Sequence, residues 1–79
     1  MVEEFFCFFN ELIKRGYYMH LEVGYNKVAD YCIRVYRKGL GEDGEDLELC
    51  WAQDGDMELA FAKAYVEMKQ WLRDNEGGY

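Results

Sequence analysis

The sequence predicts one α+β domain in which a helix, a three-stranded antiparallel meander and a second helix follow one another. Apolar residues recur at three- and four-residue steps near both ends of the chain, and they alternate with polar residues in the middle. The 79 residues contain no proline, and 51% of them are hydrophobic, so one dense core without a linker is expected. The whole chain, residues 1–79, should then be a single domain with both helices on one face of the sheet.

The first helix is expected to end at Gly16, a suitable C-terminal cap. Acidic Glu3 and Glu4 open it and basic Lys14 closes it, which is the order that the helix dipole favours. Its apolar stripe consists of Val2, Phe5, Phe6, Phe9, Leu12 and Ile13. Phe8 lies off this stripe, so we expect part of its ring to be exposed.

Three strands follow, because the hydrophobic period changes to two in segments 17–23, 31–36 and 47–53. A short connection around Tyr25-Asn26-Lys27 joins the first two strands, and the Gly-rich acidic loop 39–46 joins the last two. A hairpin centred near Lys27 would pair His20 with Arg34. The side chains expected to face the helices are Tyr17, Met19, Leu21, Val23, Tyr31, Ile33, Val35, Leu47, Leu49 and Trp51. Those expected on the open face of the sheet include Tyr18, His20, Glu22, Cys32, Arg34, Tyr36, Glu48, Cys50 and Ala52.

The last helix should begin after Asp54-Gly55-Asp56, where carboxylates can cap free amide groups. Its core stripe consists of Met57, Ala60, Phe61, Ala64, Met68, Trp71 and Leu72. Asn75 and Gly77-Gly78 should stop it, and the tail 75–79 is expected to fray.

An acidic tract is the most distinctive feature of the chain. Between Lys38 and Lys63 the sequence has eight acidic residues and no basic one: Glu42, Asp43, Glu45, Asp46, Glu48, Asp54, Asp56 and Glu58. With a net charge of −7, the chain should repel nucleic acid and anionic lipid and attract basic protein surfaces. The tract lacks the ligand spacing of an EF-hand calcium loop. A solvated loop followed by a helix start is the simpler interpretation, and it stays open.

Metal binding and catalysis are not expected. His20, Cys32 and Cys50 share the predicted open face, but they lie on separate strands with Arg34 among them, unlike a zinc site with paired cysteines. A Cys–His nucleophile also needs an oxyanion hole, and so short a chain has little mass to enclose a cleft. We therefore predict no enzyme activity and no cofactor. Three cysteines without a CxxC pair, Cys7 included, suggest reduced thiols.

Two further surfaces are candidates for protein contact. Leu59, Ala62 and Val66 lie opposite the core stripe of the last helix, and together with Phe8 they could serve a homodimer or a partner's groove. Incidental exposure of apolar side chains is the alternative. On the open sheet face Tyr36 is expected to pair with Tyr18, and protein contact suits it better than base stacking because acidic residues share that face.

The cytosol is the expected compartment. Residues Met1 to Glu4 are acidic where a secretion signal would be basic, and no run of about 18 apolar residues occurs, so no membrane contact is expected.

The order of elements is that of double-stranded-RNA-binding domains, but Asp54, Asp56 and Glu58 occupy the place of their basic cluster. The chain more closely resembles small acidic proteins of phages and prophages, including anti-CRISPR inhibitors of Cas9 with the same order. The similar parts are segment 9–14 leading into Gly16-Tyr17-Tyr18, strand segment 31–35 and the acidic loop.

This resemblance implies a non-enzymatic inhibitor, encoded by a phage or mobile element and acting in the host cytoplasm. Inhibitors of that kind resemble DNA in charge, and they block the site that reads the motif flanking the target. The residues that the resemblance implies in contact are Glu42, Asp43, Glu45, Asp46, Asp54 and Asp56. We expect Glu48 and Tyr36 to take part in the same contact. The alternative is a small homodimerising interaction module.

Overall fold

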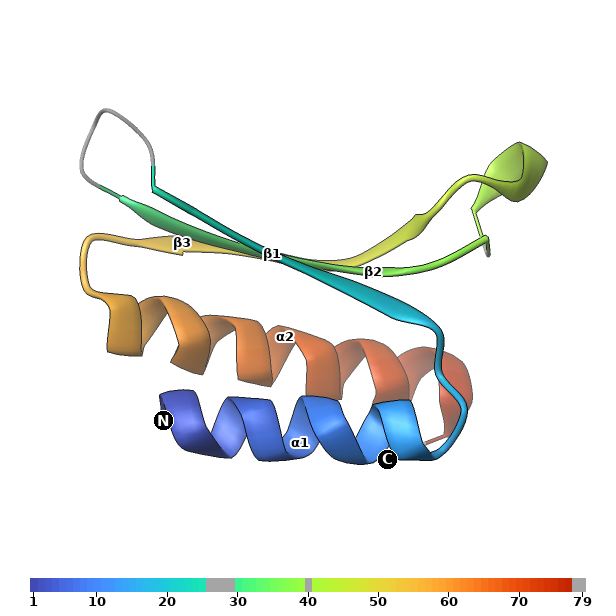
Figure 1. Ribbon diagram of the computed structural model, residues 1–79, viewed down its shortest axis with the longest axis horizontal. Helices are drawn as coiled ribbons and strands as arrows, with labels where there is room; N and C mark the ends of the chain where they lie inside the picture. Colours follow the sequence, from blue (N-terminus) through green and yellow to red (C-terminus); the bar gives the residue numbers. More distant parts are fainter. Residues whose placement is uncertain (26–29, 40, 78–79) are drawn as a thin grey trace.

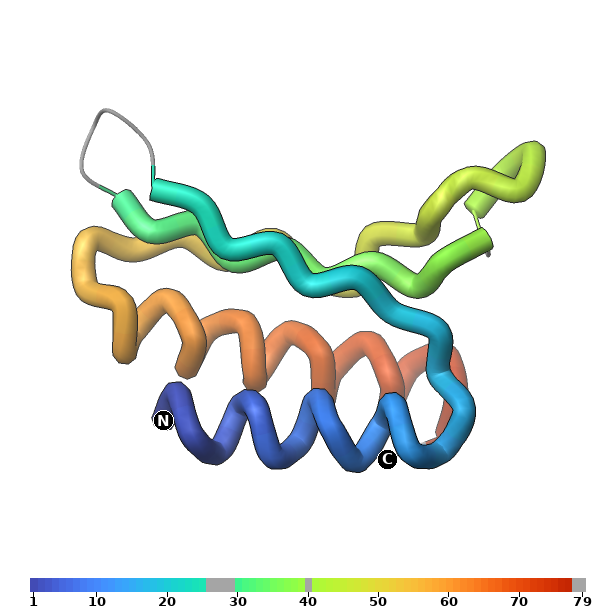
Figure 2. The backbone as a smooth tube through the Cα atoms, in the orientation of Figure 1, coloured from blue at the N-terminus to red at the C-terminus, as the bar shows by residue number. Residues whose placement is uncertain are grey.

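A computed structural model describes residues 1–25, 30–39 and 41–77. The elements are α1 (Val2–Lys14), β1 (Met19–Tyr25), β2 (Tyr31–Arg37), a 3₁₀ turn η1 (Glu42–Gly44), β3 (Leu47–Asp54) and α2 (Met57–Glu76). The strands pair antiparallel in the order β1-β2-β3. Both helices lie on the same side of the sheet (Figure 1), and the tube in Figure 2 shows α1 running opposite to β1. The predicted α-β-β-β-α fold is therefore confirmed.

The core lies between the sheet and the two helices. Its buried side chains are Phe5, Leu12, Ile33, Val35, Leu49, Cys50, Ala52, Ala60, Phe61, Ala64, Met68 and Leu72. The predicted stripe of α1 is wider than the buried one, because Phe6 and Ile13 remain 44% and 40% exposed. On α2, Met57 is also exposed at the end of the predicted stripe. The rest of that stripe is buried or half-buried.

A β-bulge in β3 changes which side chains face the helices. Val35 pairs with Cys50 but the next residue, Tyr36, pairs with Glu48, so Leu49 is an extra residue on β3. Alternation restarts after such an insertion, and the following side chains exchange faces. The prediction is therefore wrong for three residues: Cys50 and Ala52 are buried, and Trp51 is 54% exposed on the open face.

The β1–β2 hairpin is shifted by two residues from the predicted register. His20 pairs with Tyr36, and Arg34 pairs with Glu22 instead of His20. The backbone amide of Lys38 donates to the carbonyl of Tyr18 at 2.7 Å, so Tyr18 does not pair with Tyr36 as expected. An even shift leaves every side chain on its predicted face, because strand side chains alternate with a period of two. Of the predicted connection, Tyr25 ends β1, and Asn26 and Lys27 lie outside the described residues.

The ends of α2 follow the sequence signals. The Asp56 carboxylate accepts a hydrogen bond from the Leu59 amide at 3.2 Å, as an N-cap does. Gly77 takes the left-handed conformation, with φ of 76°, and caps the C-terminus. The helix extends through Glu76, two residues into the segment 75–79, and residues 78–79 lie outside the described chain.

Candidate protein-binding surfaces

The acidic tract divides into two groups at opposite ends of β3. Four of its members lie in the loop around η1, which projects beyond the sheet, and Asp54, Asp56 and Glu58 lie at the turn into α2 (Figure 1). Residues 47–53 of β3, which include Glu48, lie between the two groups and correspond to roughly 25 Å of extended strand. The predicted contact residues of the two groups therefore lie at separate ends of β3.

The group at the start of α2 is engaged within the fold. The Asp54 carboxylate lies 2.8 Å from the Lys63 ammonium and accepts the Asp56 amide at 2.9 Å. The hydrogen bond from Lys63, followed by that from the Asp56 amide, lowers the pKa of Asp54. Glu58 lies 3.0 Å from the amino terminus. Because these acids have internal partners, they have less charge to offer to another protein.

Residues 41–46 of the acidic loop are held by several contacts. The Gly41 amide donates to the Glu45 carbonyl at 2.6 Å, and the Gly39 amide donates to the Asp46 carboxylate at 3.2 Å. The Lys38 ammonium lies 3.4 Å from Asp46 as well, so Asp46 anchors the loop. A Cβ atom on Gly41 would come within 2.8 Å of the Glu45 carbonyl oxygen, which explains why glycine occupies this position. The loop therefore presents its remaining carboxylates in an organised arrangement.

Glu42, Asp43 and Glu45 are exposed around this loop. Within residues 1–25, 30–39 and 41–77, no basic group lies within ion-pair distance of them or of Glu48. Glu48 stands on the open sheet face beside its cross-strand neighbour Tyr36, which is half-buried. We call Glu42, Asp43, Glu45, Glu48 and Tyr36 the acidic end surface. Its four carboxylates project a negative field that no cation of the described chain neutralises by direct pairing.

The open face of the sheet carries a polar and aromatic cluster next to the acidic end surface. The Arg34 guanidinium lies 5.1 Å from the centre of the Trp51 ring, within cation–π range. The Trp51 indole donates a hydrogen bond to the Cys32 sulfur at 2.7 Å. Unbroken alternation along β3 would place Trp51 on the helix side, so its position here was not predicted. The adjacent apolar pair Leu49-Cys50 was the available signal, since it interrupts the alternating pattern.

His20, Cys32 and Cys50, the residues weighed as a zinc or nucleophile set, do not come together. Cys50 is buried on the helix side of the sheet, where desolvation raises the pKa of its thiol to about 12. Cys32 and His20 lie on the opposite face, on different strands. In the part of the chain that the structure describes, no three His, Cys, Asp or Glu side chains gather closely enough to hold a metal ion.

An apolar groove of about 460 Å³ runs between β3 and α2. Exposed Leu59 and Val66 line it together with Ala62 and the unexpected Trp51. Two charged side chains of α2 cover the polar edge of β3 within this groove. The Lys63 ammonium donates to the Gln53 carbonyl at 3.2 Å, and the Glu67 carboxylate accepts the backbone amide of Trp51. Side chains of α2 thus bind two of the outward backbone groups of β3.

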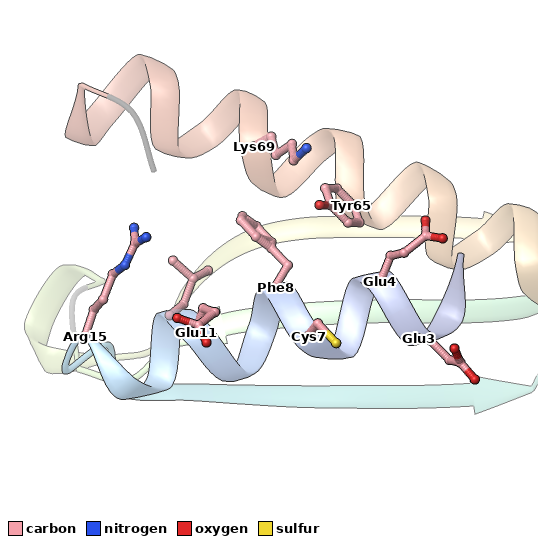
Figure 3. A pocket seen from close by; sticks show the side chains of 9 residues that line it. Glu3, Glu4, Cys7, Phe8, Glu11, Arg15, Tyr65 and Lys69 are labelled. Atoms are coloured by element: carbon pink, nitrogen blue, oxygen red, sulfur yellow. The ribbon is translucent and has the colours of Figure 1, made fainter.

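Phe8 lies on a separate surface, in a groove of about 510 Å³ between α1 and α2. Its ring stacks on that of Tyr65 with centroids 5.0 Å apart, and the Lys69 ammonium lies 4.1 Å from the centre of the Tyr65 ring. Figure 3 shows these side chains meeting between the helices, with Glu3 and Glu11 along the rim. Phe8 therefore lines a different groove from Leu59, Ala62 and Val66.

Among the described residues, neither helix combines the length and apolar character that crossing a bilayer requires. No protein-family model matches the chain, and no curated protein or solved structure gives a significant match.

Proposed function

We propose that this chain is a non-enzymatic inhibitor that docks its acidic end surface on a basic, nucleic-acid-binding site of another protein. The observation that carries the proposal is the exposure of Glu42, Asp43 and Glu45 on an ordered loop without an internal cation among the described residues. Glu48 and Tyr36 extend this surface onto the sheet.

A surface of this kind imitates a stretch of phosphate backbone. Grooves that bind nucleic acid are lined by Lys and Arg, and a negative field of fixed shape steers toward them at long range. Tyr36 adds an aromatic group of the type that contributes strongly at protein interfaces. Binding of this kind should be fast, and it should weaken as ionic strength rises.

The proposed acidic contact is smaller than the sequence suggested. Asp46 anchors the loop, Asp54 pairs with Lys63, and Asp56 caps α2. These three residues support the shape of the domain, and the loop carboxylates with Glu48 make the contact. The resemblance to anti-CRISPR proteins makes a Cas9-type nuclease of a bacterial host the first target class to test.

The test is inhibition of DNA cleavage by a panel of purified Cas9–guide RNA complexes. The wild-type chain should inhibit at least one of them, and the triple variant Glu42→Lys, Asp43→Lys, Glu45→Lys should not. A matched control, Glu4→Lys, Glu11→Lys, Asp74→Lys, changes the net charge equally at exposed helical positions, so it should still inhibit. Equal inhibition by both triple variants would contradict a role for the acidic end surface.

A further inference from the structure

The two edges of the sheet differ in how their backbone groups are satisfied. Lys63 and Glu67 cover the outer edge of β3, as natural proteins protect edge strands. For β1 there is no equivalent: in segments 1–25, 30–39 and 41–77, no side chain hydrogen-bonds to the backbone of Met19–Tyr25. Side chains therefore cover part of the β3 edge, whereas the described residues leave the β1 edge uncovered.

The contacts at the outer edge of β3 also indicate which backbone groups of β1 point away from β2. The Trp51 amide and the Gln53 carbonyl face away from β2, so Arg34, the partner of Trp51, directs its own groups toward β1. Arg34 then exchanges hydrogen bonds with Glu22. The backbone groups of successive residues point to opposite edges of a strand, so the amides and carbonyls of Met19, Leu21 and Val23 point away from β2, toward the free edge of β1.

Apolar side chains border this open edge. Val23 on β1 is 48% exposed, and Phe6 and Ile13 on α1 are 44% and 40% exposed. Ile13 lines a recess with Tyr17 and Met19, which places this part of α1 next to the start of β1. The open backbone of β1 and the uncovered flank of α1 therefore belong to one surface.

We propose that a second copy of this chain binds here, with the two β1 strands antiparallel and Leu21 opposite Leu21 of the second copy. This register aligns the outward backbone groups, because Met19 then lies opposite Val23 of the second copy. It also sets His20 against Glu22 of the second copy on the open face, twice by symmetry. Two neighbouring registers have the same hydrogen-bonding parity. One would oppose the two Glu22 carboxylates, which like charges disfavour, and the other would oppose the two His20 side chains and lose both His20–Glu22 pairs.

The α1 helix fits the same two-fold axis. An antiparallel pair of α1 helices aligns opposite helix dipoles. Glu3, Glu4 and Arg15 line the groove between α1 and α2, and Lys14 lies 3.6 Å from Glu11, so the contact is left to the apolar flank of α1. Ile13 on α1 lies near Met19 on β1. Phe9 lies about 6 Å from Ile13 along the helix axis, and Leu21 lies about the same distance from Met19 along the strand. A two-fold axis at Phe9 and Leu21 therefore relates both the β1 strands and the α1 helices of the two copies. The paired β1 strands join the two sheets into one sheet of twice the size.

Sedimentation velocity up to millimolar concentration tests the dimer. The wild type should show a dimer, and Val23→Pro should raise its dissociation constant at least about tenfold, since proline removes an outward amide donor that the monomer does not use. Leu59→Lys, in the β3–α2 groove, should leave the dimer intact. A wild type that stays monomeric overturns the proposal, as does a folded Val23→Pro protein with unchanged dimerisation.

The register has its own test that does not depend on proline. In a Cys7→Ser background, oxidation should cross-link Leu21→Cys across the axis, because facing residues lie at disulfide distance, whereas Glu22→Cys should cross-link poorly. Preferential cross-linking of Glu22→Cys would overturn the register, and cross-linking of neither would overturn the interface. None of these residues belongs to the acidic end surface, so the dimer and the inhibitor proposal can fail separately.

Discussion

Lys63 of α2 lies 2.8 Å from the Asp54 carboxylate at the end of β3, and the same ammonium donates to the Gln53 carbonyl at 3.2 Å. One cation therefore pairs with an acid of the tract, fastens α2 to the sheet and covers the edge of β3. This contact is the reason that Asp54 belongs to the scaffold and not to the acidic end surface.

Replacing Lys63 with Met should change how stability depends on pH. Lys63 lowers the pKa of Asp54 below its ordinary value of 3.8. A carboxylate with a lowered folded pKa contributes stability above its unfolded pKa, and this contribution is lost as the pH falls through the folded pKa. Urea denaturation from pH 7 down to strong acid should therefore show a smaller acid loss for Lys63→Met than for the wild type. Parallel pH profiles for the two proteins would contradict this role of Lys63.

The bulge in β3 predicts opposite tolerances at neighbouring positions. Ala52 is 4% exposed against α2, so Ala52→Leu should overfill the core and cost about 1–3 kcal/mol. Trp51 is 54% exposed on the other face, so Trp51→Leu should cost less. Thermal and urea unfolding measure both changes. If Trp51→Leu were the more damaging substitution, Trp51 could not be the side chain of β3 that faces away from the helices.

The three thiols should react in a fixed order. Cys7 is exposed, Cys32 is half-buried against the Trp51 indole, and Cys50 is buried with its pKa raised to about 12. Because the thiolate is the reactive form, Cys50 should stay unmodified by a thiol reagent until the protein unfolds. Mass spectrometry of the labelled native protein checks this. Labelling of Cys50 as fast as Cys7 would contradict its burial.

Gly41 should be needed for the shape of the acidic loop. A Cβ at this position would approach the Glu45 carbonyl oxygen to 2.8 Å, so Gly41→Ala should displace the loop and cost about 1–3 kcal/mol. A Cβ on Gly24 would meet no atom within 4 Å, and Gly24→Ala should be neutral or slightly stabilising. Comparison of their unfolding free energies is the measurement. Equal effects would mean that the Gly41 contact does not constrain the loop.

The sequence was sufficient for the fold because its signals are local and agree with one another. Helical spacing, the Asp56 cap and the Gly77 stop all describe α2, and the period of two describes the strands. Alternation also assigned β1 and β2 side chains to the correct faces although the hairpin register was shifted. The face on which a strand side chain lies depends only on whether its position is odd or even, whereas the pairing register of two strands depends on the turn that joins them.

The candidate surfaces were harder to foresee because they depend on tertiary contacts. One inserted residue at Leu49 moved Trp51 to the open face, and the apolar pair Leu49-Cys50 was its only signal in the sequence of this strand. Long-range partners such as Lys63 for Asp54, and the amino terminus for Glu58, divided a tract that is continuous in sequence. Packing on Tyr65 likewise places Phe8 in the α1–α2 groove, whereas the Leu59 strip lines the β3–α2 groove.

The decisive experiment for the proposed function is differential capture from the bacterial host, with the wild type, the Glu42/Asp43/Glu45→Lys variant and the Glu4/Glu11/Asp74→Lys control as baits. The wild type and the control should retain the same nucleic-acid-binding protein at low salt and release it as salt rises. The loop variant should not retain it at any salt concentration. Retention of that protein by the loop variant with the affinity of the wild type would contradict docking through the acidic end surface.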